Sequence, residues 1–183
     1  MTAKFFNAGG PILIEPEIYH DNRGYFSVTF EKTDFSILSQ TEFVQDNESK
    51  SSYGVLRGLH FQEAPFEQAK LVRCVKGQIM DVAMDIRPES EKFGEFVSAI
   101  LDENNHHQFY IPRGYAHGFV VLSDEAIVQY KCDNIYMPSH ENGIIWNDPD
   151  LNIDWMIPEK DIILSDKDKK NLTFKELINN GTI

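Results

Sequence analysis

The chain has 183 residues and a formal net charge of -12, from 29 acidic and 17 basic residues. This length fits one domain with a sizeable core, so we expect a single domain over residues 1–183. Nucleic acids and anionic membranes select basic surfaces, so the charge argues against both as partners. An anionic small ligand would need a local basic pocket.

The sequence has no targeting segment or cysteine pattern that indicates export. The N-terminal stretch has no apolar run long enough for a signal peptide, and no later segment approaches the roughly 18 apolar residues of a membrane helix. Cys74 and Cys132 lie in separate strand-like stretches, which favours neither a disulfide scaffold nor a zinc cluster. We therefore expect two buried thiols and a soluble, cytoplasmic protein.

The clearest strand pattern lies at residues 78–87, QIMDVAMDIR. Four apolar residues alternate there with Asp81, Ala83 and Asp85, which is the period expected of a half-buried strand. Just before it, the Lys-Gly pair at 76–77 predicts a hairpin turn.

Further strand-like stretches follow with regular turns between them. FGEFVSAIL, HQFYI, GFVVL and AIVQYKC are separated by DENN, PRG and SDE, a rhythm typical of a β-sandwich or barrel. Two short peripheral helices are predicted, one near TDFSILSQ at 33–40 and one in NLTFKELINNG at 171–181. In the second, Thr173 and Glu176 have capping-box spacing and Gly181 can close the C-terminus. The fold class is therefore predicted as all-β.

A metal site is the first chemical possibility. The segment 111–119, IPRGYAHGF, has the P-x-G-x-x-H spacing that resembles the second metal motif of cupin jelly rolls, with His117 as its histidine. The first motif needs two histidines one residue apart, but here His60 is followed by Gln62, and an amide is a poor transition-metal ligand. The adjacent histidines 106–107 are expected in a solvated turn. We therefore predict no metal.

Acid–base chemistry is the second possibility. Removing a proton from a carbon beside a ketone needs a base and a group that stabilises the enolate. His60 is the best base by its ordinary pKa. Lys70, at the head of a strand ten residues later, could neutralise the enolate oxygen, and Tyr130 could donate a proton. Pattern alone selects no acidic partner for His60.

Each of these residues also has a structural interpretation. His60 could be a core or interface group, Tyr130 ordinary core packing, and Lys70 a solvated edge residue. Arg23 fits a turn, and Arg57 could be half of a surface ion pair of little energetic value. Without further information, the residues predict a β-barrel with a polar pocket.

Seven stretches together carry a family resemblance. They are FVQDN at 43–47, GVLRGLHFQ at 54–62, KLVRCVKGQIMDVAMDIR at 70–87, IPRGYAHGF at 111–119, YKCDNIY at 130–136, ENGIIWNDPDLNIDW at 141–155 and ILSDKD at 163–168. In order and spacing they resemble the dTDP-4-dehydrorhamnose 3,5-epimerases over nearly the whole chain. The resemblance implies a metal-free, cofactor-independent cupin jelly roll that forms a homodimer. It also implies epimerisation at C3 and C5 of dTDP-4-dehydro-6-deoxy-D-glucose through an enolate, in dTDP-L-rhamnose biosynthesis.

The resemblance also assigns catalytic roles. By position, His60 resembles the family's base and Asp168 the carboxylate that orients it. Lys70 resembles the group that stabilises the enolate, and Tyr130 the acid that returns a proton from the opposite face.

The remaining site residues are assigned by resemblance to binding. Tyr136 matches a second family tyrosine near the sugar, while Arg23 and Phe26 resemble residues that meet the nucleotide diphosphate. The other ligand-contact positions are Gln45, Asp46, Asn47, Arg57, His117, Glu141 and Lys167. Arg23, Arg57 and His117 would supply the local positive field that the acidic chain otherwise lacks.

Three positions depart from the family pattern. Val28 stands where the family usually has a glutamate, which leaves the preference for thymidine open. Arg113 and Tyr115 replace the usual glutamate and phenylalanine. We interpret Arg113 as an exposed turn residue and Tyr115 as a tolerated aromatic exchange.

Three alternatives stay open. The chain could epimerise only one carbon, or a different nucleotide sugar, with Tyr130 and Tyr136 controlling the outcome. It could be a lectin-like binder, although a binder has no need of a base and an enolate clamp. It could be a metallo-cupin oxygenase, which metal analysis and chelation would test.

Overall fold

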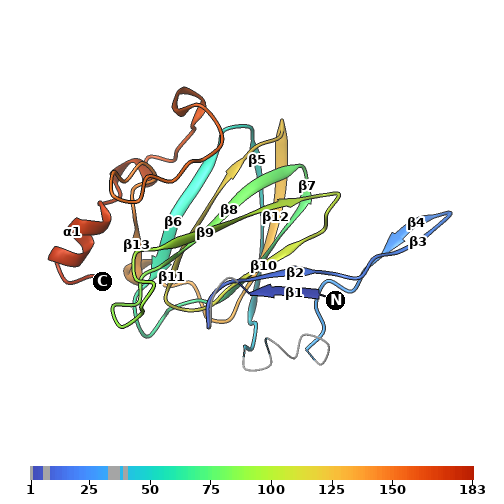
Figure 1. The fold of residues 1–183 in the computed structure, drawn as a ribbon, viewed down its shortest axis with the longest axis horizontal. Helices are drawn as coiled ribbons and strands as arrows, with labels where there is room; N and C mark the ends of the chain where they lie inside the picture. The colour runs from blue at the N-terminus through green and yellow to red at the C-terminus, as the bar shows by residue number, and fades with distance from the viewer. Residues whose placement is uncertain (1, 6–8, 33–37, 39–40) are drawn as a thin grey trace.

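Two antiparallel sheets face one another in the computed structural model, which describes residues 2–5, 9–32, 38 and 41–183 (Figure 1). The larger sheet has six strands, in the order β1 (Thr2–Phe5), β2 (Ile12–Glu15), β10 (Gln108–Ile111), β7 (Lys70–Lys76), β12 (Glu125–Cys132) and β5 (Gln45–Ser52). The smaller sheet has five, in the order β13 (Glu141–Gly143), β6 (Leu56–Gln62), β11 (Tyr115–Val121), β8 (Gln78–Asp85) and β9 (Phe96–Asp102). The all-β prediction is confirmed.

The core has two main layers. Between the sheets, buried side chains of the larger sheet such as Val72 and Phe109 pack with Ile79 and Phe119 of the smaller one. On the outer face of the smaller sheet, a second cluster is covered by the C-terminal segment, residues 144–183, which continues from β13 to the C-terminus (Figure 1). Burial of apolar area in both layers stabilises the fold by about 25 cal/mol per Å².

The prediction of a half-buried strand at 78–87 was wrong. β8 is buried on both faces, and Asp81 and Asp85 have exposed fractions of 0% and 1%. Its even-numbered apolar side chains, including Met84, lie under the C-terminal segment, while its odd-numbered apolar side chains face the other sheet. Alternation could not reveal this, because a distant segment covers the face that a free sheet would expose to water.

The hairpin prediction at 76–77 was also wrong. A turn does lie there, but β7 and β8 belong to different sheets and do not pair. Gly77 has a φ of 77°, and a Cβ at this position would lie 2.1 Å from the carbonyl oxygen of Glu125. A glycine is therefore required to turn the chain from one sheet to the other.

The C-terminal helix was predicted correctly. α1 spans Phe174–Asn179, and Thr173 and Glu176 form the complete capping box. Gly181 follows with a φ of 78°. The helix predicted near 33–40 lies largely outside the described residues. Shorter 3-10 turns, which are η2 (Pro138–His140), η3 (Glu159–Asp161) and η4 (Asp168–Lys170), complete the C-terminal half.

Replacing Thr173 by alanine is expected to lower the free energy of unfolding by about 1 kcal/mol, because the first turn of α1 loses its cap. For a chain of this size, that corresponds to a fall in Tm of about 2 to 4 °C, measurable by thermal denaturation. Lys175→Ala, which removes only an exposed ion pair with Asp150, is the control and should change Tm less. Equal shifts for the two variants would contradict the capping argument.

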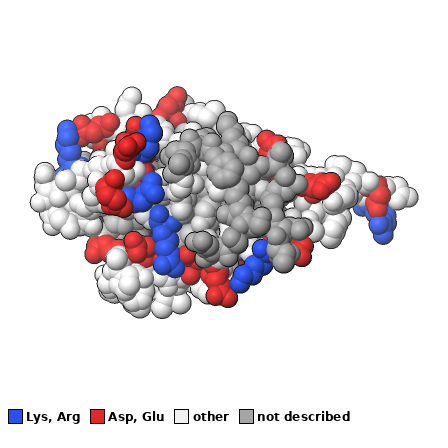
Figure 2. Space-filling model, turned by 60° about the horizontal axis from the view of Figure 1, so that its bottom comes forward, with Lys and Arg blue, Asp and Glu red and all other residues white. Residues whose placement is uncertain are grey.

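A hairpin projects from the body of the molecule. β3 (Tyr19–Asp21) and β4 (Gly24–Phe26) form this arm, which extends away from the sheets (Figure 1). Its aromatic residues are unusually exposed, at 59% for Tyr25 and 65% for Phe26. On the face shown in Figure 2, basic and acidic side chains lie interspersed over the body and at the tip of the arm. In the part of the chain that the structure describes, no helix is long and apolar enough to cross a membrane.

Candidate active site

A cavity of about 970 Å³ opens between the two sheets, and it gathers most of the predicted site. It lies beside β5 and β13, which are edge strands of their sheets, so the barrel is open there. Charged and hydrogen-bonding groups project into it from both sheets and from the C-terminal segment. The predicted site residues that line it are Gln45, Asn47, Arg57, His60, Lys70, His117, Tyr130, Tyr136, Glu141, Lys167 and Asp168.

The histidine and carboxylate predicted to act together are in direct contact. His60 lies on β6, and its Nε2 is 2.5 Å from Oδ1 of Asp168. Asp168 is almost fully buried, and its other oxygen, Oδ2, accepts a hydrogen bond from the Ser165 hydroxyl at 2.9 Å. The carboxylate thereby fixes the ring orientation of His60 and leaves the ring Nδ1 available for chemistry.

Backbone pairing brings Asp168 to His60 across a long sequence separation. Residues 161–165 run beside the start of β6, where Leu56 donates its N–H to the carbonyl of Ile163, and Ile163 donates its own to Gly54. The chain then turns through η4, and the hydroxyl of Ser165 accepts the backbone N–H of Asp168 at 3.1 Å. Sequence pattern could not predict this pairing, since nothing local marks the segment as a neighbour of β6.

Asp168 should make the stability of the protein depend on acid pH. Burial alone would raise the pKa of Asp168, but the hydrogen bond and charge of His60 and the bond from Ser165 outweigh it, so this pKa is lowered from 3.8. The stabilising contribution is therefore fully present above the unfolded pKa near 3.8 and is lost as pH falls through the lower folded value. Urea unfolding of wild type and Asp168→Asn should differ at pH 6 and converge toward pH 3. A constant difference would contradict this assignment.

Lys70 and Tyr130 face His60 from the opposite wall. They lie on the neighbouring strands β7 and β12 of the six-stranded sheet, whereas His60 belongs to the five-stranded sheet. Burial lowers the pKa of Lys70, and the charges of Asp81 and Glu141 partly oppose that effect. Burial raises the pKa of Tyr130, which keeps its phenol protonated. A ligand between the sheets would thus meet a base on one side and a cation with a proton donor on the other.

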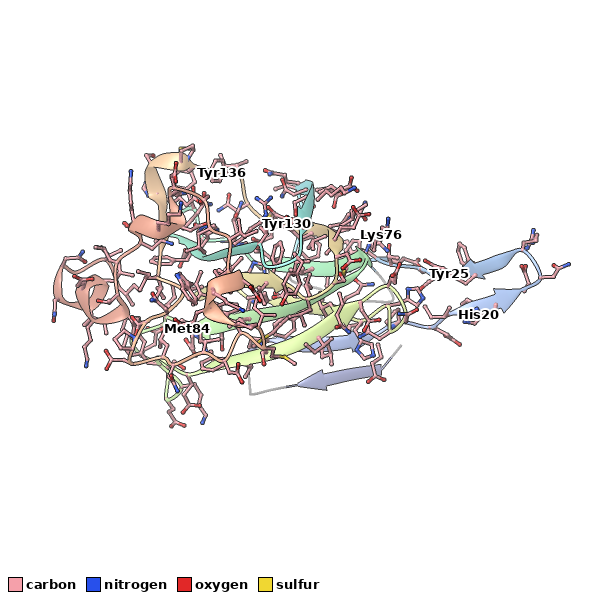
Figure 3. The ribbon with its side chains drawn as sticks, turned by 90° about the horizontal axis from the view of Figure 1, so that it is seen from above. His20, Tyr25, Lys76, Met84, Tyr130 and Tyr136 are labelled. Carbon is pink, nitrogen blue, oxygen red and sulfur yellow. The ribbon has the colours of Figure 1, made fainter. Side chains whose placement is uncertain are left out.

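Three further residues join at the mouth of the cavity. Glu141, on β13, accepts hydrogen bonds from the Tyr136 hydroxyl and from the Lys167 ammonium group. Burial would raise the pKa of Glu141, but these two bonds lower it, while the same carboxylate raises the pKa of Tyr136 to about 12. Figure 3 shows Tyr130 and Tyr136 on the same side of the body. Lys167 therefore enters the site as half of an ion pair.

The arginine in β6 has no carboxylate partner among the described residues. Arg57 lines the cavity, and its Nε donates to the Ser51 hydroxyl at 3.2 Å. The structural interpretation of Arg57 as half of a surface ion pair is therefore wrong. On β5, Gln45 and Asn47 face the cavity and hydrogen-bond to one another at 2.8 Å.

Three predicted ligand contacts lie outside this cavity. Asp46 alternates with its neighbours on β5, so its side chain points to the outer face, where it pairs with Lys131 at 2.8 Å. Arg23 and Phe26 lie on the projecting arm, where Arg23 hydrogen-bonds to Asp21. Figure 3 shows His20 and Tyr25 of the same arm, far from Tyr130 and Tyr136. Arg23 and Phe26 therefore do not line the cavity of their own chain.

Sequence reasoning missed one buried carboxylate beside the site. Asp81, on β8, lies 2.8 Å from Nε2 of His117, which has an exposed fraction of 6%. Alternation marked Asp81 as the solvent side of a strand. A usable signal was present, since Asp81 lies in the same apolar strand as Asp85, and two carboxylates there need partners if the strand is buried.

Metal coordination finds little support in the residues present. Among the described residues, no group of three or more His, Cys, Asp or Glu side chains is arranged to hold an ion. Gln62, at the position of a cupin's second histidine, donates to the carbonyls of Phe66 and Ile135 and accepts the N–H of Met137. Its amide therefore braces two loops at the rim of the cavity.

The two exchanged residues in the 111–119 segment both form specific contacts. Arg113 lies exposed in the turn as expected, and it pairs with Asp133 at 2.8 Å. Tyr115 does more than replace a phenylalanine, because its hydroxyl contacts Asp85 and Arg87. This hydroxyl helps to satisfy the buried Asp85.

The fold and the site together define the class of protein. Two facing antiparallel sheets form a cupin-type jelly roll, and its cavity holds a His–Asp pair opposite a lysine and a tyrosine. These groups suit proton transfer at carbon beside a carbonyl.

Comparison with known proteins identifies the family. The family model described as dTDP-4-dehydrorhamnose 3,5-epimerase matches residues 7–176. An enzyme of that name from Methanothermobacter thermautotrophicus is 52% identical over 163 residues, covering 87% of each chain. This chain belongs to the dTDP-4-dehydrorhamnose 3,5-epimerase family.

Two solved structures of known relatives share the fold. An epimerase from Legionella pneumophila, in complex with dTDP-4-keto-L-rhamnose, has a TM-score of 0.90 at 43% identity, covering 95% of this chain and 93% of its own. A 3'-monoepimerase from Streptomyces bikiniensis, in complex with dTDP-quinovose, has a TM-score of 0.88 at 32% identity, covering 95% and 88%.

Proposed function

We propose that this chain is an isomerase that epimerises dTDP-4-dehydro-6-deoxy-D-glucose at C3 and C5 through an enolate. The product, dTDP-4-dehydro-6-deoxy-L-mannose, would serve dTDP-L-rhamnose biosynthesis. The observation that carries the proposal is the His60–Asp168 pair on one wall of the cavity, facing Lys70 and Tyr130 on the other. Family membership supports the same substrate and reaction.

The first chemical step is proton removal beside the C4 ketone. Nε2 of His60 bonds to Asp168, so the ring Nδ1 takes the proton from carbon. The electrons of the C–H bond form a C=C bond, and the carbonyl pair moves to the C4 oxygen as an enolate. The ammonium group of Lys70 stabilises that oxygen by charge and hydrogen bonding, and Asp168 stabilises the imidazolium.

The second step inverts the carbon. The Tyr130 hydroxyl gives its proton to the opposite face, the C4 carbonyl reforms, and Tyr130 is left as a phenolate. A proton relayed from His60 to Tyr130 through solvent restores both groups. Because both C3 and C5 flank the same ketone, one base and one enolate site can serve two inversions.

The nucleotide end would lie at the mouth of the cavity. Arg57 offers positive charge there for a diphosphate, in a chain with a net charge of -12, and Lys167 adds a donor that is already paired with Glu141. Gln45 and Asn47 supply hydrogen bonds, Glu141 holds Tyr136 and Lys167 in place, and His117 contacts the sugar. For Asp46, only its backbone is positioned to contribute.

Arg23 and Phe26 would reach a nucleotide only in a homodimer. Their arm projects away from the body of its own chain and carries exposed aromatic side chains (Figure 1). A second copy would therefore receive them at the mouth of its cavity. We propose such a homodimer, built from a single epimerase domain over residues 1–183, acting in the cytoplasm.

One incubation tests substrate, reaction and regiochemistry together. The purified protein is mixed with dTDP-4-dehydro-6-deoxy-D-glucose in deuterated water, and the product is assigned by NMR. Deuterium at both C3 and C5 with inversion at both is expected. A lectin-like binder would give no exchange, and a metal-dependent enzyme would lose activity on chelation.

A single-carbon epimerase is the second candidate. A protein of this fold from Streptomyces bikiniensis, 32% identical to this chain, is described as a 3'-monoepimerase. Inversion at one carbon only would favour it, and Tyr130→Phe and Tyr136→Phe would then be compared for the site of exchange.

A further inference from the structure

Asp81 occupies an unusual position for a charged group. Its exposed fraction is 0%, and its strand β8 lies between β11 and β9 in the five-stranded sheet. Across the sheet it faces Phe119 and Ala99, both buried. Burying an unpaired carboxylate is strongly unfavourable, so a residue of this type needs a compensating partner.

The described residues compensate Asp81 only partly. Oδ1 bonds to Nε2 of His117 at 2.8 Å, whereas Oδ2 is buried with no hydrogen-bond partner within the described residues. The other buried carboxylate of β8 differs, because both oxygens of Asp85 are satisfied by Arg87, Ser90 and Tyr115. Asp85 is thus held by three structural partners, whereas Asp81 hydrogen-bonds to His117 alone among the described residues.

His117 joins this carboxylate to the cavity. It lies on β11, pairs in register with His60 of β6, and lines the cavity. Since Nε2 is held by Asp81, the ring can offer only Nδ1 to a ligand, and Nδ1 has no partner among the described residues. An ionised carboxylate accepts hydrogen bonds only, so it requires the proton of a neutral ring to be on Nε2.

The charges around His117 favour that neutral ring. Burial lowers the pKa of His117, the charge of Asp81 opposes this, and the charge of Lys70 from β7 lowers it further, as does any positive charge that His60 from β6 acquires. A neutral His117 with a proton on Nε2 carries a lone pair on Nδ1. Such a group accepts a hydrogen bond and is unsuited to bind a phosphate oxygen.

We propose that Asp81 is a positioning residue that holds His117 as the neutral Nε2–H tautomer, so that Nδ1 accepts a hydrogen bond from a hydroxyl of the bound sugar. This inference rests on the proposed function for the identity of the ligand. It changes the predicted role of His117, which becomes a hydroxyl acceptor rather than part of the positive field. Asp81 acts through His117 and contacts no reacting atom.

The tautomer is measured without substrate, by ¹⁵N NMR of the histidine side chains at pH 7. His117→Gln identifies the His117 signals by their loss. Wild type should show a protonated Nε2 and an unprotonated Nδ1. An Nδ1–H tautomer or a doubly protonated ring in wild type would overturn the proposal, whether or not the chain is an epimerase.

Two variants separate positioning from simple stability. Asp81→Leu, which has similar shape but no acceptor, should shift both ring signals toward values of mixed tautomers. Asp85→Asn removes the other buried carboxylate of β8 and should leave the His117 signals unchanged. If Asp81→Leu folds and retains the wild-type tautomer, Asp81 is not the positioning group.

Substrate analogues test the hydrogen bond itself. Two analogues are compared, one lacking the C2 hydroxyl and one lacking the C3 hydroxyl. Wild type should exchange deuterium into one of them about tenfold more slowly than into the substrate, which is the effect of one lost hydrogen bond. Asp81→Leu should lose that discrimination. If wild type handles both analogues as well as the substrate, Nδ1 accepts no sugar hydroxyl. No exchange with the substrate itself would instead refute the proposed function and leave the NMR result standing.

Discussion

Replacing His60 by alanine is expected to slow deuterium incorporation at both C3 and C5 by about 10³-fold, because one base serves both carbons. Among the described residues, His60 is the one histidine whose ring hydrogen-bonds to Asp168, and this bond uses Nε2, so Nδ1 can take a proton from carbon. Nucleotide binding should change little, since Arg57 and Lys167 lie elsewhere in the cavity. The rates are measured by NMR in deuterated water, and the affinity by titration with dTDP.

His107→Ala provides a matched control for His60→Ala. This histidine lies after β9, in the turn before β10, and outside the cavity. Its removal should leave both exchange rates unchanged. If His60→Ala still exchanged deuterium at one carbon at the wild-type rate, that carbon would have a different base, and the single-base mechanism would be wrong.

The sequence predicted where several strands lie, but it did not predict which strands pair with one another. Alternation located β8, an apolar stretch after turn residues located β12, and capping-box spacing located α1, because these signals depend on residues close in the chain. The same alternation could not tell that β7 and β8 belong to opposite sheets, nor that the C-terminal segment buries β8. Those facts depend on contacts between distant residues.

The site residues also divide into those that local pattern predicts and those that depend on distant contacts. His60, Lys70 and Tyr130 were selected by chemical type within strands, but Asp168 came only from family resemblance, since 108 residues separate it from His60. Asp81 was overlooked because a buried carboxylate and a solvent-facing one look alike in an alternating pattern. The arm residues Arg23 and Phe26 were assigned to the ligand, although one chain alone cannot bring them there.

The charges of the cavity explain how an acidic chain can bind an anion. Two of its carboxylates already have partners, since Asp168 bonds to His60, and Glu141 bonds to Lys167 and Tyr136. Arg57 and Lys70 have no carboxylate in hydrogen-bond contact within the described residues, so their charge is available to a ligand. The negative net charge is therefore no obstacle, because binding responds to the local field.

Lys70→Met is expected to lower kcat by about 10²- to 10³-fold with a smaller change in KM, because methionine keeps the length of the side chain but cannot stabilise the enolate oxygen. Enolate charge exists only after proton removal, so its loss should affect the chemical step more than substrate binding. The measurement is the rate of deuterium exchange under saturating substrate. Lys76→Met, at the exposed end of the same strand, loses only an ion pair with Glu125 and should exchange normally.

The pH profile gives the same prediction a second and independent test. Burial lowers the pKa of Lys70 below the 10.5 of an ordinary lysine, so activity that needs its ammonium form should decline at a pH below that value. Lys70→Arg keeps a positive charge at every accessible pH, and if it retains measurable activity, the alkaline decline assigned to Lys70 should disappear. The decline would persist if it came from another group, such as Tyr130. A Lys70→Met variant with wild-type kcat would show that the enolate is stabilised elsewhere in the cavity.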